Sequence, residues 1–215
     1  CPSDKADFKM DMYNADGSRG AMCGNGIRCV GKYVYDRKLT RKTCLTIDTD
    51  AGPRGLELAV RGGKVEQVTV DMGQAILYPE VELEAMGEQY TVHQVGVGNP
   101  HAVIFCPDPE GVRLEELGPV LECHPNLRER SNVEFVSCQD GHDLHVRVWE
   151  RGSGITLACG TGACAAFEAA RQQGLCGSRA EARLPGGTLG LEWREGRIFM
   201  TGPARTGFEG EIEMG

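Results

Sequence analysis

Residues 150–167, ERGSGITLACGTGACAAF, organise the interpretation of the whole chain. The glycine-rich first half leads into CGTG at residues 159–162, and the segment after it is rich in alanine, the strongest helix former. The pattern therefore predicts a cysteine at the start of a helix. Free backbone N–H groups and the helix dipole at such a position favour a thiolate or a bound carboxylate.

A second copy of this design lies earlier in the chain. Residues 14–29 read NADGSRGAMCGNGIRC, so that Cys23 precedes Gly-Asn-Gly as Cys159 precedes Gly-Thr-Gly. In both copies a Gly-Ser pair stands a few residues before the cysteine. The repeat indicates an internal duplication, and the two thiols differ from the other eight cysteines by preceding a glycine-rich helix start.

The order strands, helix, strands occurs twice along the chain, which predicts an α+β fold. We expect two pseudo-symmetric domains, each a mostly antiparallel sheet wrapped around a central helix. The expected domains are residues 1–66 together with 206–215, and residues 67–205. The central helices are predicted at 24–37 and 160–173, a further helix at 113–123, and a returning C-terminal strand at 207–214.

Composition excludes several classes of function. The chain has 215 residues and a formal net charge of −8 without a basic cluster, which argues against nucleic-acid binding. No apolar run approaches the length of a membrane span, and no secretory signal is recognisable. The ten cysteines include no CxxC pair, so we predict no metal site. We interpret the remaining eight as packed or incidental thiols: Cys1, Cys29, Cys44, Cys106, Cys123, Cys138, Cys164 and Cys176.

Two thiols at two helix starts suit a proton transfer across one carbon atom. One thiolate removes a proton from one face, and the opposed thiol returns a proton to the other face, which inverts the centre without a cofactor. A free cysteine has a pKa of about 8.5, and a helix N-terminus is expected to lower it toward neutrality. Cys23 and Cys159 are therefore predicted to be partly ionised and the most easily oxidised of the ten thiols.

The motifs NADGS, MCGNGIRC, GNPHAV, SNVEFV and ERGSGITLACGTGACAAF, which span essentially the whole chain, resemble those of the diaminopimelate epimerases. That family comprises cofactor-independent amino-acid epimerases of lysine and peptidoglycan-precursor synthesis, which convert LL- to meso-diaminopimelate. The resemblance implies a cytoplasmic enzyme, a homodimer, and diaminopimelate as the small-molecule substrate, with neither nucleic acid nor membrane as partner.

The resemblance also implies roles for particular residues. The acid/base pair is Cys23 and Cys159. Four backbone or side-chain groups would bind the reacting α-carboxylate, namely those of Gly24, Asn25, Gly160 and Thr161. The rest of the substrate, chiefly its distal amino-acid end, would be bound by Asn14, Asn99, Asn132, Glu150 and Arg151. Two residues match positions that adjust the thiol pKa values: His101 and Glu150.

Alternatives stay open at this point. The family begins with several dozen further residues, so we expect this chain to start within a domain, and a catalytically dead fragment or binding protein is one alternative. Proline racemases and hydroxyproline epimerases also use two cysteines, but they carry His where this chain has Asn25. A non-catalytic thiol or metal-binding module is a further alternative. Taken singly, the asparagines fit turns, and Glu150-Arg151 fits an exposed ion pair.

Overall fold

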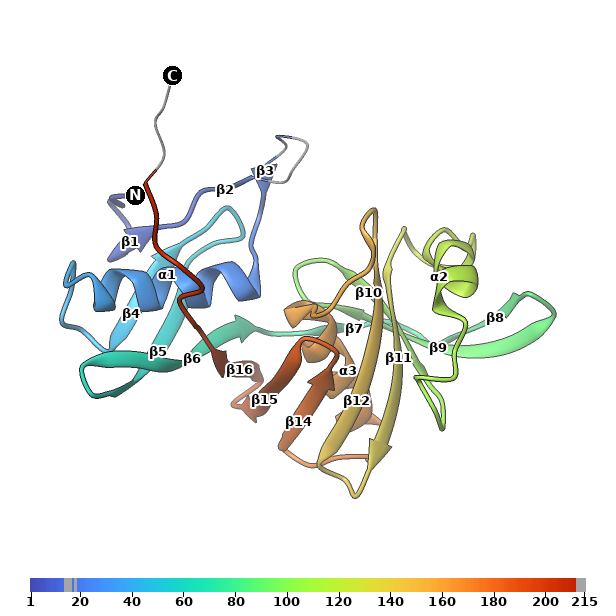
Figure 1. Ribbon diagram of the computed structural model, residues 1–215. Helices are drawn as coiled ribbons and strands as arrows, with labels where there is room; N and C mark the ends of the chain where they lie inside the picture. Colours follow the sequence, from blue (N-terminus) through green and yellow to red (C-terminus); the bar gives the residue numbers. More distant parts are fainter. Residues whose placement is uncertain (14–16, 18, 212–215) are drawn as a thin grey trace. The chain divides into compact units, whose positions relative to one another are not determined.

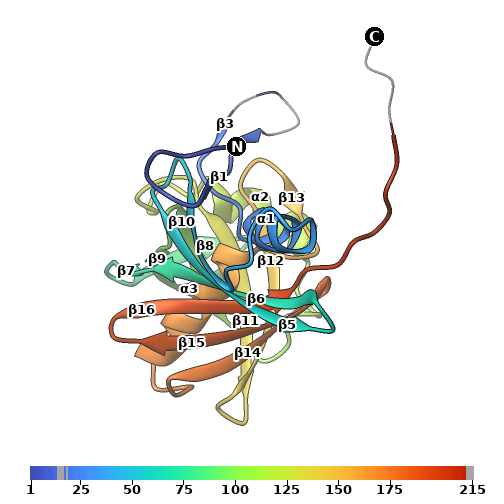
Figure 2. The same cartoon turned by 90° about the vertical axis from the view of Figure 1, so that its left-hand side faces the viewer.

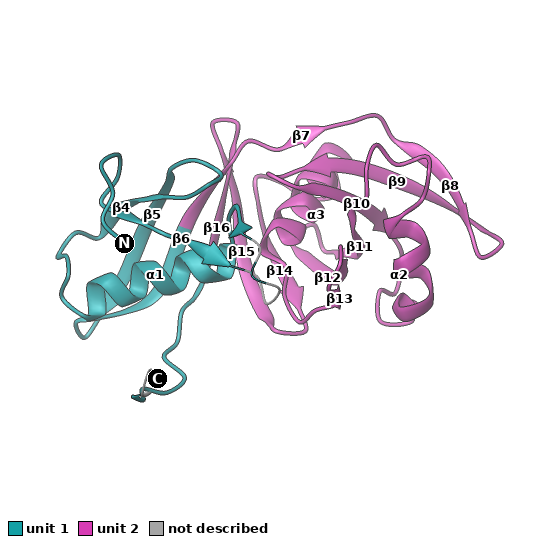
Figure 3. Ribbon diagram, turned by 90° about the horizontal axis from the view of Figure 1, so that it is seen from above, with its two compact units in different colours: residues 1–69, 202–215 teal, residues 70–201 magenta. Residues whose placement is uncertain are grey.

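The computed structural model describes residues 1–13, 17 and 19–211. The chain divides into two compact units, residues 1–69 with 202–215 and residues 70–201 (Figure 3). The sequence placed these boundaries at 66/67 and 205/206. Two strands, β6 and β16, run through the boundaries at 69/70 and 201/202.

The first unit consists of one helix and a small sheet (Figure 1). Its sheet has the order β1-β4-β5-β6, with β1 parallel to β4 and β4 antiparallel to β5. A separate ladder joins β2 to β3. The elements are β1 (Phe8–Lys9), β2 (Met12–Tyr13), β3 (Arg19–Gly20), α1 (Gly24–Asp36), β4 (Cys44–Asp48), β5 (Arg54–Arg61) and β6 (Lys64–Gly73).

Helix α1 packs on this sheet through a narrow apolar stripe. Ile27, Gly31 and Val34 are buried at helical spacing. A Cβ atom on Gly31 would lie 2.8 Å from a methyl carbon of Leu56 and 3.1 Å from one of Leu58, both on β5. Glycine at position 31 therefore lets the helix approach the sheet closely, which places the start of the helix relative to the strands.

The second unit is a larger mixed sheet around a helix. Its strand order is β16-β15-β14-β12-β11-β10-β9-β7, with β13 paired to β12 and β8 to β9. Two neighbouring pairs are parallel, β10 with β11 and β12 with β14. Figure 2 shows β14, β15 and β16 side by side. The elements are β7 (Ile76–Leu77), β8 (Val81–Ala85), β9 (Glu88–Gly96), β10 (Pro100–Phe105), α2 (Leu114–Glu122), β11 (Asn132–Gln139), β12 (Asp143–Glu150), β13 (Gly154–Ile155), α3 (Gly160–Gln172), β14 (Arg179–Leu184), β15 (Gly187–Arg194) and β16 (Arg197–Pro203).

Helix α3 is the centre of this unit (Figure 1). It contacts strands β9, β10, β11, β12, β14 and β15, and every residue from Gly162 to Ala170 is buried. The alanines explain why strands can surround it so closely, because their small side chains bury on all sides without holding the sheet away. Helix α2 packs on the sheet through a separate hydrophobic cluster. In this cluster its Leu114, Leu117 and Leu121 pack with Phe135 of β11.

The mixed α+β class and the central helices agree with the sequence-based expectation, and the helix ends differ by one residue. The expected C-terminal strand is wrong over its described part, because residues 204–211 form no strand. Phe208 in that segment is 92% exposed, so its apolar side chain is not packed against the rest of the described chain. None of the helices within the described residues combines the length and the apolar composition that a membrane crossing requires.

Candidate active site

The two cysteines occupy the same position at the starts of two helices. Cys23 is the N-cap of α1, and its sulfur accepts a hydrogen bond from the backbone N–H of Gly26 at 3.4 Å. Cys159 is the N-cap of α3, and its sulfur accepts from Gly162 N–H at 3.3 Å. Both cap residues are extended, with φ of −135° and −116°. The structure thus confirms the equivalent helix-start placement that the repeated motif predicts.

The expected ionisation of Cys159 is wrong. Burial, with the nearby carboxylates of Glu134 and Glu150, raises the pKa of this thiol to about 12. The hydroxyl of Thr161, 3.5 Å from the sulfur, and the N–H of Gly162 act in the opposite direction but do not outweigh it. The side chain is only 6% exposed, so the loss of hydration dominates over the favourable helix N-terminus.

A buried hydrogen-bonded chain lies beside Cys159. The imidazole Nδ1 of His101 is 2.7 Å from Glu134 Oε1, and its Nε2 is 3.0 Å from Asn99 Oδ1. The side chains of His101 and Glu134 are completely buried. Burial raises the pKa of the Glu134 carboxyl, with His101 opposing the shift. The sequence analysis missed Glu134, although its signal is visible: an acidic residue stands inside a strand whose residues 132–137 are all buried.

Asn132 connects two of the predicted site segments. Its amide Nδ2 donates to the carbonyl of Pro100 at 3.1 Å, and its Oδ1 accepts from the backbone N–H of Arg151 at 2.9 Å. The Arg151 guanidinium donates to the carbonyl of Arg130 at 3.2 Å and remains exposed. Asn99 and Arg151 line a hollow of about 330 Å³, together with Ile76, Tyr78, Gly96, Gly98, Pro100 and Glu129. Asn99, Glu129 and Arg151 give this hollow a polar part of its lining.

Glu150 is the last residue of β12 and precedes Arg151, which lines the 330 Å³ hollow. Its Oε1 accepts a hydrogen bond from the hydroxyl of Thr156, a partner that the sequence did not indicate. On the other side of the strand end, the indole N–H of Trp149 donates to Glu122 at 2.7 Å. Hydrogen bonds of Trp149 and Glu150 therefore fix the end of β12, where Glu150 and Arg151 lie. The two residues do not form a simple exposed ion pair.

The first unit holds the remaining predicted residues. Asn25 Oδ1 accepts from the Arg28 guanidinium at 3.0 Å, and Arg28 also donates to the carbonyl of Gly24 at 3.0 Å. A further bond at 3.3 Å ties Arg28 to Pro203 O. This buried arginine, which sequence reasoning missed, fixes the first turn of α1. Asn14 lies outside the described residues.

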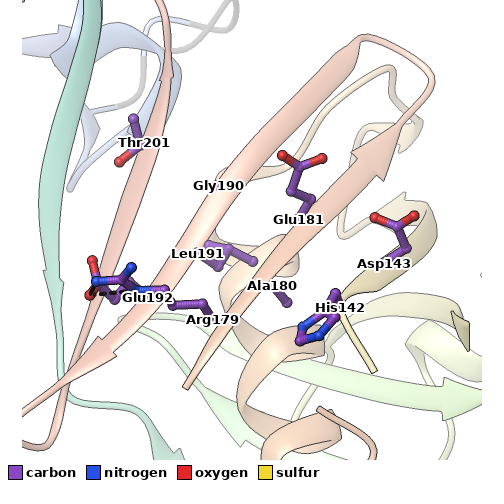
Figure 4. Close-up of a pocket in the computed structure, with 9 residues that line it drawn as sticks. All are labelled: His142, Asp143, Arg179, Ala180, Glu181, Gly190, Leu191, Glu192 and Thr201. Carbon is purple, nitrogen blue, oxygen red and sulfur yellow. Dashed lines mark hydrogen bonds and ion pairs between the residues drawn. The ribbon is translucent and has the colours of Figure 1, made fainter. Parts of the chain in front are cut away.

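Another hollow, of about 480 Å³, lies over β14 and β15 (Figure 4). Its lining includes His142, Glu181 and Thr201, and none of the predicted site residues contributes to it. Its Arg179 and Glu192 form an ion pair at 2.6 Å. Within residues 1–13, 17 and 19–211 there is no group of three or more His, Cys, Asp or Glu side chains arranged to hold a metal ion.

The fold is shared with solved structures of low sequence identity. A crystal structure of a hydroxyproline epimerase from Agrobacterium vitis superposes with a TM-score of 0.74 at 17% identity, covering 93% of this chain and 69% of that one. A phenazine biosynthesis protein of the PhzF family from Enterococcus faecalis gives 0.74 at 17% identity, covering 96% of this chain and 78% of that one. These similarities establish the fold.

Sequence comparison then defines the family. The family model for diaminopimelate epimerase matches residues 1–78 and 93–207. A diaminopimelate epimerase from Methanococcus maripaludis strain C5 is 48% identical over 228 residues, covering 99% of this chain and 82% of that protein. One from Bacteroides thetaiotaomicron is 50% identical over 215 residues, covering 98% and 79%. The chain belongs to the diaminopimelate epimerase family, a family of isomerases.

Proposed function

We propose that this protein interconverts LL- and meso-diaminopimelate by two-thiol acid/base catalysis, without a cofactor, in lysine and peptidoglycan-precursor synthesis. The observation that carries the mechanism is the matched pair of cysteine N-caps, Cys23 on α1 and Cys159 on α3. Each sulfur accepts a hydrogen bond from a helix N–H group, so each has the same local means of holding negative charge when its proton leaves.

The proposed reaction moves two protons and leaves the substrate bonds otherwise intact. A thiolate at one cysteine takes the α-proton, and the negative charge passes into the α-carboxylate as an enediolate. The thiol of the other cysteine then protonates the opposite face of the carbon, so the two sulfurs exchange their protonation states. Backbone N–H groups at the helix starts, in residues 24–25 and 160–161, are suited to bind that carboxylate.

Arg151, Asn99 and Asn132 are proposed to bind the distal amino-acid end. Asn99 and Arg151 line the 330 Å³ hollow, and Asn132 accepts a hydrogen bond from the backbone N–H of Arg151. The exposed guanidinium of Arg151 offers a fork for a carboxylate. Proline and hydroxyproline lack a second amino-acid end. A racemase acting on these smaller substrates would leave the polar groups of the hollow without a ligand, so the family's own substrate is favoured.

Deuterium exchange tests the mechanism most directly. The protein is incubated with LL-diaminopimelate in D₂O with EDTA present, and α-deuterium uptake and meso product are followed by NMR. We expect both to appear. Cys23→Ser and Cys159→Ser should each abolish epimerisation, whereas Cys164→Ser, at a buried cysteine one turn further along α3, serves as the matched control. Loss of activity with EDTA and recovery with zinc would refute the cofactor-free mechanism.

We also propose a cytoplasmic homodimer, as the family resemblance implies. Multi-angle light scattering at several protein concentrations measures the oligomeric state. A mass that stays at that of one chain across the range would contradict the dimer.

A further inference from the structure

Glu134 is a buried carboxyl group that the proposed mechanism does not use. It lies on β11, and its side chain is completely shielded from solvent. One oxygen, Oε1, is bonded to His101 Nδ1 at 2.7 Å, while Oε2 is buried without a hydrogen-bond partner among the described residues. A buried carboxyl with a vacant oxygen is costly, and groups of this kind are retained chiefly where they serve a site.

Gly162 shows how close Glu134 lies to the Cys159 thiol. A Cβ atom on this glycine would be 2.6 Å from Glu134 Oε1 and 3.3 Å from Cys159 Sγ. The carboxyl and the sulfur therefore border the same small volume at the first turn of α3. Only glycine leaves that volume open, because any side chain would collide with the carboxyl oxygen.

The equivalent position in the other motif lacks this feature. A Cβ atom on Gly26 would lie 3.6 Å from Cys23 Sγ and 3.8 Å from Met10 Sδ, at ordinary contact distances, and none of its three nearest atoms among the described residues belongs to a carboxyl group. The two helix starts thus match in backbone and thiol but differ in the group opposite the glycine. A carboxyl faces Cys159, and a thioether lies near Cys23.

The titratable groups that bear on the Cys159 thiol come from two strands. Glu134 on β11 and Glu150 on β12 both disfavour the thiolate, while Thr161 and Gly162 of α3 favour it. His101, on β10, is bonded to Glu134 and carries the opposite potential charge. Of the two carboxylates, Glu134 is the one that is completely buried, so solvent screens its charge least.

We propose that Glu134 is a positioning residue that fixes the ring of His101 and keeps Cys159 in its thiol form, loaded with the proton that it delivers. This inference rests on the proposed acid role of Cys159. Glu134 transfers no proton to the substrate itself. Its carboxyl stabilises the protonated starting state of the Cys159 thiol.

The test measures the ionisation of Cys159 separately from catalysis. Modification by methyl methanethiosulfonate is followed as a function of pH, and the site is located by peptide mass spectrometry. Glu134→Gln removes the charge at nearly constant volume. We expect the midpoint of the Cys159 pH dependence to fall by about one unit, which increases the modification rate at pH 8 about tenfold. The pH profile of kcat/KM should move to lower pH in parallel.

Three controls separate this effect from loosening of the fold. Glu134→Asp keeps the charge and should retain the wild-type midpoint. Glu168→Gln removes a different buried carboxyl of α3, which is paired with Arg171, and should leave the midpoint and the shape of the pH profile unchanged. Cys164, completely buried in the same helix, should stay unmodified in every variant. If Glu134→Gln does not fold, His101→Gln provides a second test: without the imidazole that lowers the pKa of Glu134, this carboxyl takes up a proton more readily, and Cys159 modification at pH 8 should become faster.

The proposal is overturned if Glu134→Gln leaves the Cys159 midpoint unchanged, or if Cys164 becomes modified at the same rate as Cys159. Likewise, slower Cys159 modification in His101→Gln contradicts it. Failure of the proposed function looks different. A protein without epimerase activity can still show the shifted midpoint, whereas an active epimerase with an unshifted midpoint refutes only the role of Glu134.

Discussion

At the residue scale, the two motif glycines, Gly26 and Gly162, occupy equivalent positions in the repeated motif but have different surroundings. Ala at position 162 places a methyl group 2.6 Å from a buried carboxyl oxygen, whereas Ala at position 26 has no neighbour closer than 3.5 Å. We expect Gly162→Ala to lower the free energy of unfolding by about 1–3 kcal/mol through overpacking. Gly26→Ala should be neutral or stabilising by up to about 1 kcal/mol, because alanine favours the helix.

Urea denaturation of both variants and the wild type measures this difference. Equal free energies of unfolding for the two variants would show that the Glu134 carboxyl group moves away from a methyl group at position 162 without loss of stability. In that case, the close approach of Glu134 to the helix start would not constrain the residue at position 162.

Arg151 provides a second prediction at this scale. Lysine keeps the positive charge but loses the planar fork that matches a carboxylate. We expect Arg151→Lys to reduce kcat/KM for LL-diaminopimelate more than tenfold, a loss of about 1.4 kcal/mol or more of transition-state stabilisation. Steady-state kinetics measures it, with Arg113→Lys, at an exposed arginine paired to Glu116, as the matched control. A wild-type kcat/KM in Arg151→Lys would remove this residue from the substrate site.

At the element scale, helix α2 is anchored by a buried carboxylate at its last residue. Glu122 accepts from the Trp149 indole and pairs with Arg130, and Gly118 lies so close to Trp149 that its Cβ atom would be 2.4 Å from the ring. Although burial acts to raise the pKa of Glu122, the bonds from Trp149 and Arg130 outweigh it and hold the pKa below its ordinary value. This contact joins α2 to the strand that carries Glu150.

The lowered pKa of Glu122 predicts a pH-dependent contribution to stability. The contribution is complete above the unfolded-state pKa of about 4.3 and is lost as the pH falls through the lower folded-state pKa. Glu122→Gln should therefore destabilise the protein by about 1–3 kcal/mol at pH 7. The difference from the wild type should shrink as the pH falls below the unfolded-state pKa and through the lower folded-state pKa. Denaturation across this range checks the sign, and a constant or widening difference would contradict it.

At the scale of the whole molecule, exposure and local charge rank the thiols differently from the sequence motif. Cys29, Cys44 and Cys123 are exposed, whereas Cys159 is buried with its pKa raised to about 12. Burial also raises the pKa of Cys176 to about 11. The sequence-based expectation that Cys159 is among the most easily oxidised thiols is therefore wrong, because a protonated, buried sulfur is a poor nucleophile.

Limited alkylation of the native protein with iodoacetamide at pH 7 should follow this ranking. We expect Cys29, Cys44 and Cys123 to be modified before Cys159 and Cys176, with peptide mapping at successive times as the measurement. A denatured sample, in which all ten thiols should react at comparable rates, is the control. Modification of Cys159 before Cys29, Cys44 and Cys123 would show that its thiolate is more accessible than the structure indicates.

The sequence by itself determined the repeated motif, the helix-start position of both cysteines and the mixed α+β class. Each of these depends on local patterns: glycines before an alanine-rich run, a cysteine able to cap a helix, and apolar residues at the period of the element that contains them. It also identified Asn99, His101, Asn132 and Arg151, which the structure brings together in one unit through the ends of β10, β11 and β12.

Only the tertiary structure decided the ionisation of Cys159 and the place of Glu134. The helix start favours a thiolate and can be recognised along the chain, but desolvation and the carboxylates come from strands β11 and β12, which the fold places against α3. Burial and charge depend on residues that are distant in sequence, so no local pattern carries them. In the sequence, Glu134 is an ordinary strand residue. Only the fold places its carboxyl group beside Gly162 and the Cys159 thiol, at the first turn of α3.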